Sequence, residues 1–393
     1  MPISDAVKLI KGPKGTNVIL TIKKVDGEVV DLKIKRDIVL LEETYVRSSI
    51  VSKHENLYGF INLPKFYIDF DNSTSRDAAK DIKKEIIRLK NLGVKGLVLD
   101  LRNNGGGSLK TVVEMAGLFI QEGPIVQVRS MDKESKILRD KDRSIIWEGP
   151  LVILVNEFSA SASEILAAAM QDYKRAIIIG SKQTYGKGTV QNVLDLNRMV
   201  KSNTNGDLGA LKFTTQKYYR INGGSTQLEG VKSDIVVPDK YTYVDFGEKD
   251  QENPLEWDMI EPVSYEPWKS LFDYNKTIDA SKNRMKSSEF IRLIDENAKW
   301  IKSIRDRDIY TLNYSKFKKD LLLNEEKAKK YKKLSDYSSD LTFKSLPYEI
   351  DLIAKDSSLG EKRKRWHKNL SKDIYVNESL NVLNDLRLSY VER

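Results

Sequence analysis

The stretch LVILVNEFSASASEILAAAMQDY, residues 151–173, joins a short apolar run to a longer helical pattern through a turn of small residues. Residues 151–155 are apolar throughout, which predicts a strand that is buried on both faces. Small side chains dominate 159–163, where the backbone must turn tightly, and a helical pattern follows to about Tyr173. A buried strand that leads directly into a helix is typical of a layered α/β core.

The same alternation of strands and helices continues on both sides of this stretch. Residues 77–92 carry apolar residues at helical spacing and end at Gly93, and residues 94–101 form another apolar run. Further predicted elements are strands at 59–63, 125–129 and 175–180, a helix at 109–120, and a return to strands over 207–237. We therefore predict an α/β core over residues 37–245.

Residues 1–36 have a different pattern, with one short helix and two strands. The predicted elements are a helix capped by Ser4 and Asp5 and two strands, 17–23 and 29–35, around a turn at Asp26-Gly27. One helix and two strands make too small a core to fold alone. We expect them to be the end of a larger β-rich module.

Residues 246–393 carry many charges, with Trp, Tyr and Leu at helical spacing, and predict a mainly helical, basic C-terminal domain. The formal net charge of the chain is +9, and residues 281–393 hold 26 Lys and Arg against 18 Asp and Glu. Such a surface could meet nucleic acid, anionic lipid or an acidic partner. Its basic clusters lack the interleaved aromatic and glycine-rich motifs of nucleic-acid modules, so we expect a solvated helical face and no nucleic-acid partner.

The chain has no cysteine and only two histidines, His54 and His367. Disulfide frameworks, thiolate catalysis and cysteine metal sites are therefore excluded, and little material remains for a Ser-His-Asp triad or a histidine zinc site. His54 lies in a polar connection and His367 in a basic run, so we assign neither a function. The first residues lack a basic segment followed by an apolar run, and we expect no signal peptide in this chain.

Ser161 and Ser163 lie at the predicted start of the helix that follows strand 151–155. A serine there has free backbone N–H groups and the positive end of the helix dipole beside it, which suits a nucleophile whose attack creates an oxyanion. The alternative interpretation is that both serines cap the helix and Glu164 completes a capping box. The motif by itself favours this second interpretation.

With so few histidines, a serine nucleophile needs another base, and a buried lysine whose pKa is lowered can serve. Lys187 is held between Gly186 and Gly188, shortly after the predicted strand that ends at Gly180. Five residues separate Gly180 from Gly186, where a Walker phosphate loop needs four, and Gly188 stands where that loop needs Ser or Thr. We therefore reject a phosphate loop. Most lysines are surface residues, so the segment alone is weak evidence for a base.

A third motif, DLRNNGGGS at 100–108, follows the predicted strand 94–101 and opens a helix. Backbone N–H groups of such a glycine turn can bind a phosphate or a tetrahedral oxyanion. The motif does not fit the G-x-G-x-x-G pattern and is weak by itself.

Taken together, the three motifs resemble the carboxy-terminal processing proteases, and the long chain with its helical tail is most similar to their tail-specific branch. The motifs that carry the resemblance are LDLRNNGGG at 99–107, SASASE at 159–164, AAAMQDY at 167–173, YGKGTVQ at 185–191 and YYRINGGSTQ at 218–227. The resemblance covers residues 1–245 and continues more loosely through the tail.

The resemblance implies a crotonase-like α/β core that works as a serine protease with a Ser-Lys dyad. Ser161 would be the nucleophile, because the serine of the family is followed by Ala-Ser-Glu, and Lys187 would be the general base. Gln191 would orient the lysine amine, and the backbone N–H groups of Gly106 and Ala162 would form the oxyanion hole. No metal ion or organic cofactor is implied.

The resemblance also implies partners and a compartment. Residues 1–36 resemble the last helix and strands of a PDZ domain, a module that captures substrate C-termini by strand addition. The expected partners are proteins or peptides with accessible C-termini, with an adaptor protein as a further candidate. The expected compartment is the periplasm, free or associated with the membrane.

We therefore expect a serine endopeptidase that cleaves proteins near their C-termini. The alternatives are a catalytically impaired peptide-binding or adaptor fragment on a protease scaffold, and crotonase-type acyl-CoA chemistry. Intact Ser161 and Lys187 favour the enzyme over the adaptor, and acyl-CoA chemistry leaves their pairing unexplained.

Asp172 is a further acidic residue in the helical segment that follows Ser161. It lies eleven residues after Ser161, which corresponds to about 16 Å along one helix. That distance is too long for a direct hydrogen bond, so we expect Asp172 to be structural.

Overall fold

The computed structural model describes residues 3–23, 29–36, 44–53, 55–69, 76–131, 133–200 and 206–389. The chain divides into two compact units, residues 1–44 and residues 45–393. The domain boundaries predicted from the sequence, 1–36, 37–245 and 246–393, remain a proposal.

The described part of the first unit contains a helix, α1 (Ile3–Ile10), and two antiparallel strands, β1 (Asn17–Lys23) and β2 (Val29–Lys35). The strands pair Asn17 with Lys35 and Lys23 with Val29, which confirms both predicted strands. The predicted turn at Asp26-Gly27 lies outside the described residues. Leu9 of α1 is 67% exposed, as expected of a core that is too small to cover its apolar residues.

The second unit is built on a seven-stranded sheet in the order β12-β9-β8-β5-β4-β3-β13. The strands from β12 to β4 run parallel, and β3 and β13 are antiparallel to their neighbours. The bounds are β3 (Arg47–Lys53), β4 (Asn56–Asn62), β5 (Leu97–Asp100), β8 (Leu151–Val155), β9 (Ile177–Gly180), β12 (Ile235–Val236) and β13 (Thr342–Lys344). The strands β4, β5, β8 and β9 confirm predicted elements, whereas β3 and β13 are not among them.

Alternate residues of this sheet face two separate cores. Leu97 and Leu99 of β5 face one core and Val98 faces the other, as the two-residue period of a strand requires. Three helices pack on the first face: α2 (Ala78–Asn91), α3 (Leu109–Ala116) and α4 (Ala162–Asp172). All three confirm predicted helices, although α3 ends four residues earlier than the helix predicted at 109–120.

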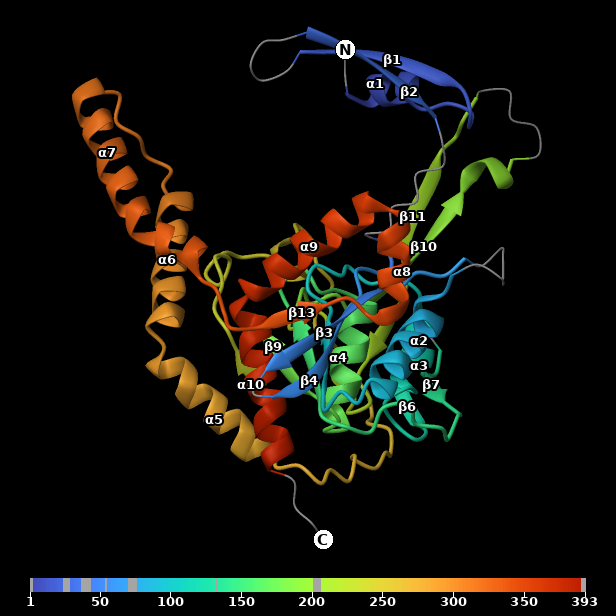
Figure 1. Cartoon of the computed structure of the whole chain (residues 1–393). Helices are drawn as coiled ribbons and strands as arrows, with labels where there is room; N and C mark the ends of the chain where they lie inside the picture. Colours follow the sequence, from blue (N-terminus) through green and yellow to red (C-terminus); the bar gives the residue numbers. More distant parts are fainter. Residues whose placement is uncertain are drawn as a thin grey trace. The chain divides into compact units, whose positions relative to one another are not determined.

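The opposite face of the sheet is covered by the C-terminal helices α9 (Ser357–Ser371) and α10 (Ile374–Leu388). Leu380 and Leu383 of α10 are fully buried, and a Cβ atom added at Gly96 would lie 3.0 Å from Leu383 Cδ2. Figure 1 shows α10 packed along the sheet. The apolar face of α10 forms one wall of the core, whereas basic residues of α9 such as Lys362, Lys364 and Arg365 are exposed, in agreement with the expected solvated face.

A second sheet contains four antiparallel strands in the order β10-β11-β6-β7. Their bounds are β6 (Gly123–Ser130), β7 (Lys136–Asp140), β10 (Thr189–Asp195) and β11 (Ala210–Tyr219). Strands β10 and β11 extend beyond the body of the unit as a long arm (Figure 1). Strand β6 confirms the strand predicted at 125–129, whereas β7 and β10 are not among the predicted elements.

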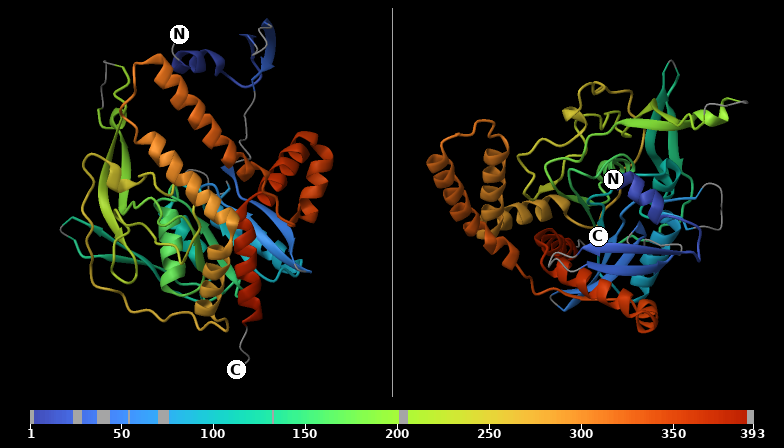
Figure 2. Two further views of the ribbon diagram at one scale, coloured as in Figure 1. Left: turned by 90° about the vertical axis from the view of Figure 1, so that its left-hand side faces the viewer. Right: turned by 90° about the horizontal axis from the view of Figure 1, so that it is seen from above.

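The remaining helices belong to the C-terminal part of the second unit and are visible from two further directions in Figure 2. Their bounds are α5 (Tyr274–Ser287), α6 (Glu289–Arg305), α7 (Tyr314–Tyr331) and α8 (Pro347–Lys355), with short 3-10 turns at Leu196–Arg198, Glu248–Asp250 and Lys332–Asp336. Arg284 ties α5 to α10 by ion pairs of 2.8 Å with Glu378 and 2.6 Å with Asp385. Among the described residues, no helix combines the length and the apolar character that crossing a bilayer requires.

Candidate active site

The three predicted motifs follow three neighbouring parallel strands of the central sheet. The glycine turn 103–107 follows β5, the serine turn 159–163 follows β8, and the lysine loop 181–188 follows β9. Because parallel strands end at the same edge of a sheet, the three loops meet at that edge, where α/β proteins commonly bind ligands.

Ser161 immediately precedes α4 in an unusual backbone conformation. Its φ is 57°, a left-handed value that is uncommon for residues other than glycine, and the residue is half-buried. Conformations of this kind persist only where the surrounding structure enforces them, and they cluster at functional sites. The carboxylate of Glu164 accepts a hydrogen bond of 2.8 Å from the backbone N–H of Ser161. The glutamate contact of the predicted capping box is therefore confirmed.

The glycine turn packs directly against the serine turn. A Cβ atom added at Gly106, whose φ is +102°, would lie 2.7 Å from the Cβ atom of Ser161 and 3.0 Å from the backbone nitrogen of Ala162. A larger residue at this position would have to displace the serine turn. The backbone carbonyl of Asn104 accepts a hydrogen bond of 3.0 Å from the N–H of Ala160 and joins the two turns.

The predicted oxyanion hole is brought together, but one of its donors is engaged. The N–H of Gly106 donates to Asn104 Oδ1 at 2.9 Å, within its own turn. The N–H of Ala162 is the first of α4 and therefore has no carbonyl acceptor within the helix. The roles of Gly106 and Ala162 in binding an oxyanion remain predictions.

The Nζ of Lys187 donates a hydrogen bond of 2.9 Å to Gln191 Oε1, so the structure joins these two predicted site residues. Burial lowers the pKa of Lys187 and the charge of Lys212 lowers it further, whereas two nearby glutamates oppose this shift. Within the described part of the chain, no hydrogen bond joins Lys187 Nζ to Ser161 Oγ. The lysine amine is thus held by its predicted orienting residue, Gln191.

One buried carboxylate links the serine turn to the lysine loop. Glu164 Oε2 accepts hydrogen bonds from the N–H groups of Ser161 at 2.8 Å and Lys187 at 3.0 Å. Glu164 Oε1 accepts from the Thr184 hydroxyl at 2.6 Å and from the Gly186 N–H at 2.7 Å. Because the backbone nitrogens of Ser161 and Lys187 bind the same oxygen atom, they lie within about 6 Å of one another.

Residues of the segment 218–227 hold the backbone of the lysine loop at Lys187 and Gly188. The hydroxyl groups of Tyr218 and Thr226 both donate to the Lys187 carbonyl, the second at 2.9 Å. The side-chain oxygen of Gln227 accepts a hydrogen bond of 2.8 Å from the Gly188 N–H. None of these three residues was predicted to have a role in the site, although the motif at 218–227 was an available signal.

The protonation of the buried Glu164 side chain should make the stability of the folded protein depend on pH. Burial raises the pKa of Glu164 to about 7, although its hydrogen-bond donors lower it. Between the ordinary glutamate pKa and pH 7, the folded protein keeps a proton that the unfolded chain releases, so this group lowers stability as pH rises through that range. The unfolding free energy of the wild type relative to Glu164→Gln should fall by about 3 kcal/mol from pH 4 to pH 8.

Urea unfolding of both proteins at several pH values measures this difference. The control is Glu325→Gln at an exposed position of α7, which should leave the pH dependence of the wild type unchanged. A difference between wild type and Glu164→Gln that stays constant with pH would show that Glu164 does not titrate in this range.

The other residues weighed from the sequence lie outside this arrangement. Asp172 forms an ion pair of 2.5 Å with Arg220 and accepts a hydrogen bond of 3.0 Å from Asn222, which agrees with the expected structural role. The Nε2 atom of His367 lies 3.2 Å from Ser49 Oγ. His54 lies outside the described residues.

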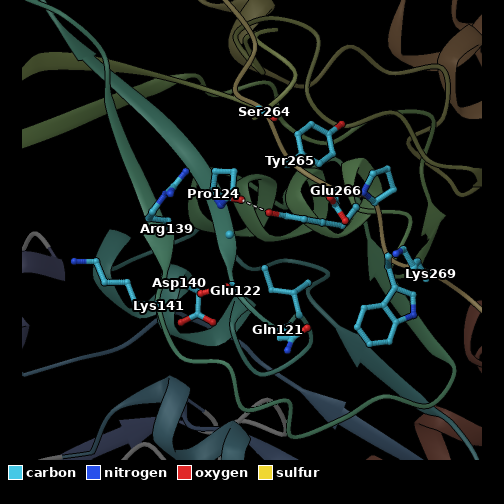
Figure 3. A pocket seen from close by; sticks show the side chains of 15 residues that line it. Gln121, Glu122, Pro124, Arg139, Asp140, Lys141, Ser264, Tyr265, Glu266 and Lys269 are labelled. Atoms are coloured by element: carbon cyan, nitrogen blue, oxygen red, sulfur yellow. Dashed lines mark hydrogen bonds between the residues drawn. The ribbon is translucent and has the colours of Figure 1, made fainter.

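A cavity of about 790 Å³ lies elsewhere in the second unit, between the start of β6, the end of β7 and residues 264–269 (Figure 3). The hydroxyl of Tyr173, which lines it, donates to the Pro124 carbonyl at 3.0 Å. Tyr173 follows the C-terminal end of α4, whereas Ser161 precedes its N-terminal end. The serine and lysine loops therefore do not open into this cavity.

Comparison with known proteins shows the class to which this arrangement belongs. The sequence profile of peptidase family S41 matches residues 58–237, and the profile of the C-terminal domain of tail specific protease matches residues 241–387. Residues 58–237 therefore belong to peptidase family S41. The C-terminal part of the chain carries the domain of the tail-specific proteases, which confirms the resemblance seen in the motifs.

The similar proteins include the tail-specific protease of Haemophilus influenzae, which is 36% identical over 360 residues that cover 90% of this chain and 50% of the relative. The carboxy-terminal processing protease CtpA of Bacillus subtilis is 33% identical over 251 residues, which are 62% of this chain and 48% of the relative. Among solved structures, the photosystem II D1 C-terminal processing protease has 28% identity and a TM-score of 0.42, over 60% of this chain and 59% of that chain. The chain spans about half the length of the curated relatives it matches.

Proposed function

We propose that this chain is a serine endopeptidase that cleaves polypeptides near their C-termini, with Ser161 as nucleophile and Lys187 as general base. The observation that carries the proposal is the Glu164 carboxylate, which binds the backbone N–H groups of both residues. A carboxylate in this position holds a strained serine beside a half-buried lysine. Such an arrangement suits a nucleophile and its base.

The proposed reaction follows serine acyl transfer. Neutral Lys187 takes the proton of Ser161 Oγ, which attacks the scissile carbonyl carbon and forms a tetrahedral oxyanion. The C–N bond then breaks, Lys187 returns the proton to the leaving amine, and an acyl ester remains on Ser161. Water, deprotonated by the same lysine, hydrolyses that ester and releases the new C-terminus.

The N–H groups of Gly106 and Ala162 stabilise the oxyanion in this proposal. The Gly106 N–H must then leave Asn104 Oδ1, which requires the peptide between Gly105 and Gly106 to rotate. Glycine on both sides of that peptide permits the rotation, because glycine adopts left-handed and right-handed backbone conformations alike. Gln191 keeps the lysine amine oriented between the two chemical steps.

Several finer features belong to the same proposal. The central seven-stranded sheet with α2, α3 and α4 on one face is proposed to be a crotonase-like core, and residues 1–36 are proposed to be part of a PDZ domain. Substrates would be proteins with accessible C-termini, an adaptor protein is a further candidate partner, and the site of action would be the periplasm, free or at the membrane. The matched name "tail-specific protease" and the domain at 241–387 support this proposal.

The experiment is to incubate the chain with a disordered polypeptide and to map the products by mass spectrometry. New C-termini at internal peptide bonds are expected, together with an acyl adduct on the fragment that contains Ser161 after a rapid acid quench. The Ser161→Ala variant, shown to be folded by circular dichroism, should give neither. Cleavage by Ser161→Ala at the rate of the unmodified chain would overturn the assignment of the nucleophile, and absence of cleavage by a folded wild type would overturn the proposed function.

A further inference from the structure

Strand β10 connects the lysine loop to a free sheet edge. It begins at Thr189, two residues after Lys187, and contains Gln191, which holds the lysine amine. Among the strands that the structure describes, the order is β10-β11-β6-β7, so β10 has a described partner strand on one side only. An unpaired strand edge is a template for an extended polypeptide, which can add to it through backbone hydrogen bonds.

The hydrogen-bond pattern indicates which groups of β10 point outward. Just beyond the strand, the N–H of Leu196 donates to the Gly209 carbonyl at 3.0 Å, so this position pairs towards the β11 side. Backbone groups of an antiparallel strand alternate in direction, so the groups of residues 191, 193 and 195 point away from β11. Within the described part of the chain no strand lies beside them.

The face of the arm that carries Gln191 also carries two charged residues, Lys212 and Asp195, and Asp195 forms an ion pair of 3.5 Å with Arg198. Across the strand pair, Thr214 lies opposite Gln191 and Lys212 lies opposite Val193, so these side chains share one face. The charge of Lys212 acts on Lys187, which agrees with this placement. Lys212 is exposed and forms no ion pair within the described residues.

We infer that an extended substrate adds to the outward edge of β10 as a further strand, and that Lys212 selects substrates with an acidic side chain beside the arm. The inference rests on the proposed function and names the docking strand and a specificity-determining residue. Strands in a sheet lie about 4.8 Å apart, so a substrate residue next to β10 is about 10 Å from the Cα atom of Lys212. A lysine side chain and a glutamate side chain together span that distance.

The first experiment tests the charge preference. It uses disordered peptides that carry Glu or Lys at one position, scanned along both sides of the scissile bond. Wild type should prefer Glu to Lys at one or two positions, with a ratio of kcat/KM of about fivefold. The Lys212→Glu variant should reverse the preference at those positions. Because this variant also changes the field at Lys187 for every substrate, the ratio between two substrates is the readout. Lys136→Glu, the same charge change on β7 at the opposite edge of the sheet, should keep the wild-type ratio.

The second experiment tests backbone pairing of the substrate with β10 and uses variants of Val193, which is 68% exposed. The Val193→Pro variant removes an outward N–H without removing a bond to β11, and should raise KM about tenfold for all peptides. Val193→Ala keeps that N–H and should raise KM less. Binding of the same peptides to Ser161→Ala, followed by fluorescence anisotropy, tests docking separately from chemistry. Equal affinity of Glu and Lys peptides, or an unchanged preference in Lys212→Glu, would overturn the inference. The proposed function would still be supported if cleavage depended on Ser161.

Discussion

Replacing Lys187 by alanine or by arginine should abolish peptide cleavage, with a fall in kcat/KM on the order of 10⁴-fold or more. Alanine removes the base. Arginine keeps the positive charge and much of the length, but it stays protonated at any pH that a protein survives and cannot accept the serine proton. Burial and the charge of Lys212 lower the pKa of Lys187, so the wild-type rate should rise with pH up to that lowered pKa and then level off.

The matched control is Lys182, an exposed lysine of the same loop. Lys182→Ala and Lys182→Arg should retain wild-type kcat/KM, and all four variants should keep the wild-type melting temperature. Gln191→Ala should cost less than either Lys187 variant, because it removes only the hydrogen bond that orients the amine. Full activity in Lys187→Arg would refute the assignment of the base.

The second large effect concerns the C-terminal helix. Leu380 and Leu383 of α10 are fully buried against the central sheet, in one core with Val98 of β5 and Val152 of β8. Replacing a buried leucine by alanine costs about 2–5 kcal/mol, and a typical domain is stable by about 5–15 kcal/mol. We expect Leu380→Ala with Leu383→Ala to unfold most of the second unit at 37 °C.

Thermal unfolding followed by circular dichroism measures this effect, with peptide cleavage as a second readout. Leu388 lies on the same helix and is 67% exposed, so Leu388→Ala should change the melting temperature by no more than one or two degrees. A double variant that kept the wild-type melting temperature would mean that α10 is not part of the core in solution.

The C-terminal helix also supports the glycine turn of the site. Arg102, which directly precedes that turn, forms ion pairs of 2.8 Å with both Asp100 and Asp373. Asp373 caps α10 by accepting hydrogen bonds from the N–H groups of Tyr375 and Val376. Unfolding of α10 therefore removes a partner of the turn that contains Gly106, so loss of activity and loss of stability should occur together.

Local patterns in the sequence determined most of the core. The apolar run 151–155 became β8 because a strand covered on both faces has apolar residues at every position. The helix predicted at 77–92 became α2 because its apolar residues recur at helical spacing and Asp77 caps its first turn. Each of these features depends on neighbouring residues only, which is why the sequence by itself was sufficient.

The candidate site residues came from the sequence by a different route. Ser161, Lys187 and Gln191 were assigned through the resemblance of three motifs to a protease family, which the family match to residues 58–237 supports. Their individual roles remain predictions. The residues themselves left open whether Ser161 is a nucleophile or a helix cap, because a serine before a helix suits both.

Only the tertiary structure decided which groups meet. Glu164 has the sequence pattern of a capping residue. Its contacts with Thr184, Gly186 and Lys187 exist because β8 and β9 end at one sheet edge, where the loops that follow them meet. The burial of Leu383 on the sheet beside Gly96 was equally hidden, because a helical period shows that one face is apolar but not what covers it. The hydrophobic period of a segment shows which of its faces is apolar. Its hydrogen-bond and packing partners are distant in sequence, and the packing of the whole chain decides which residues they are.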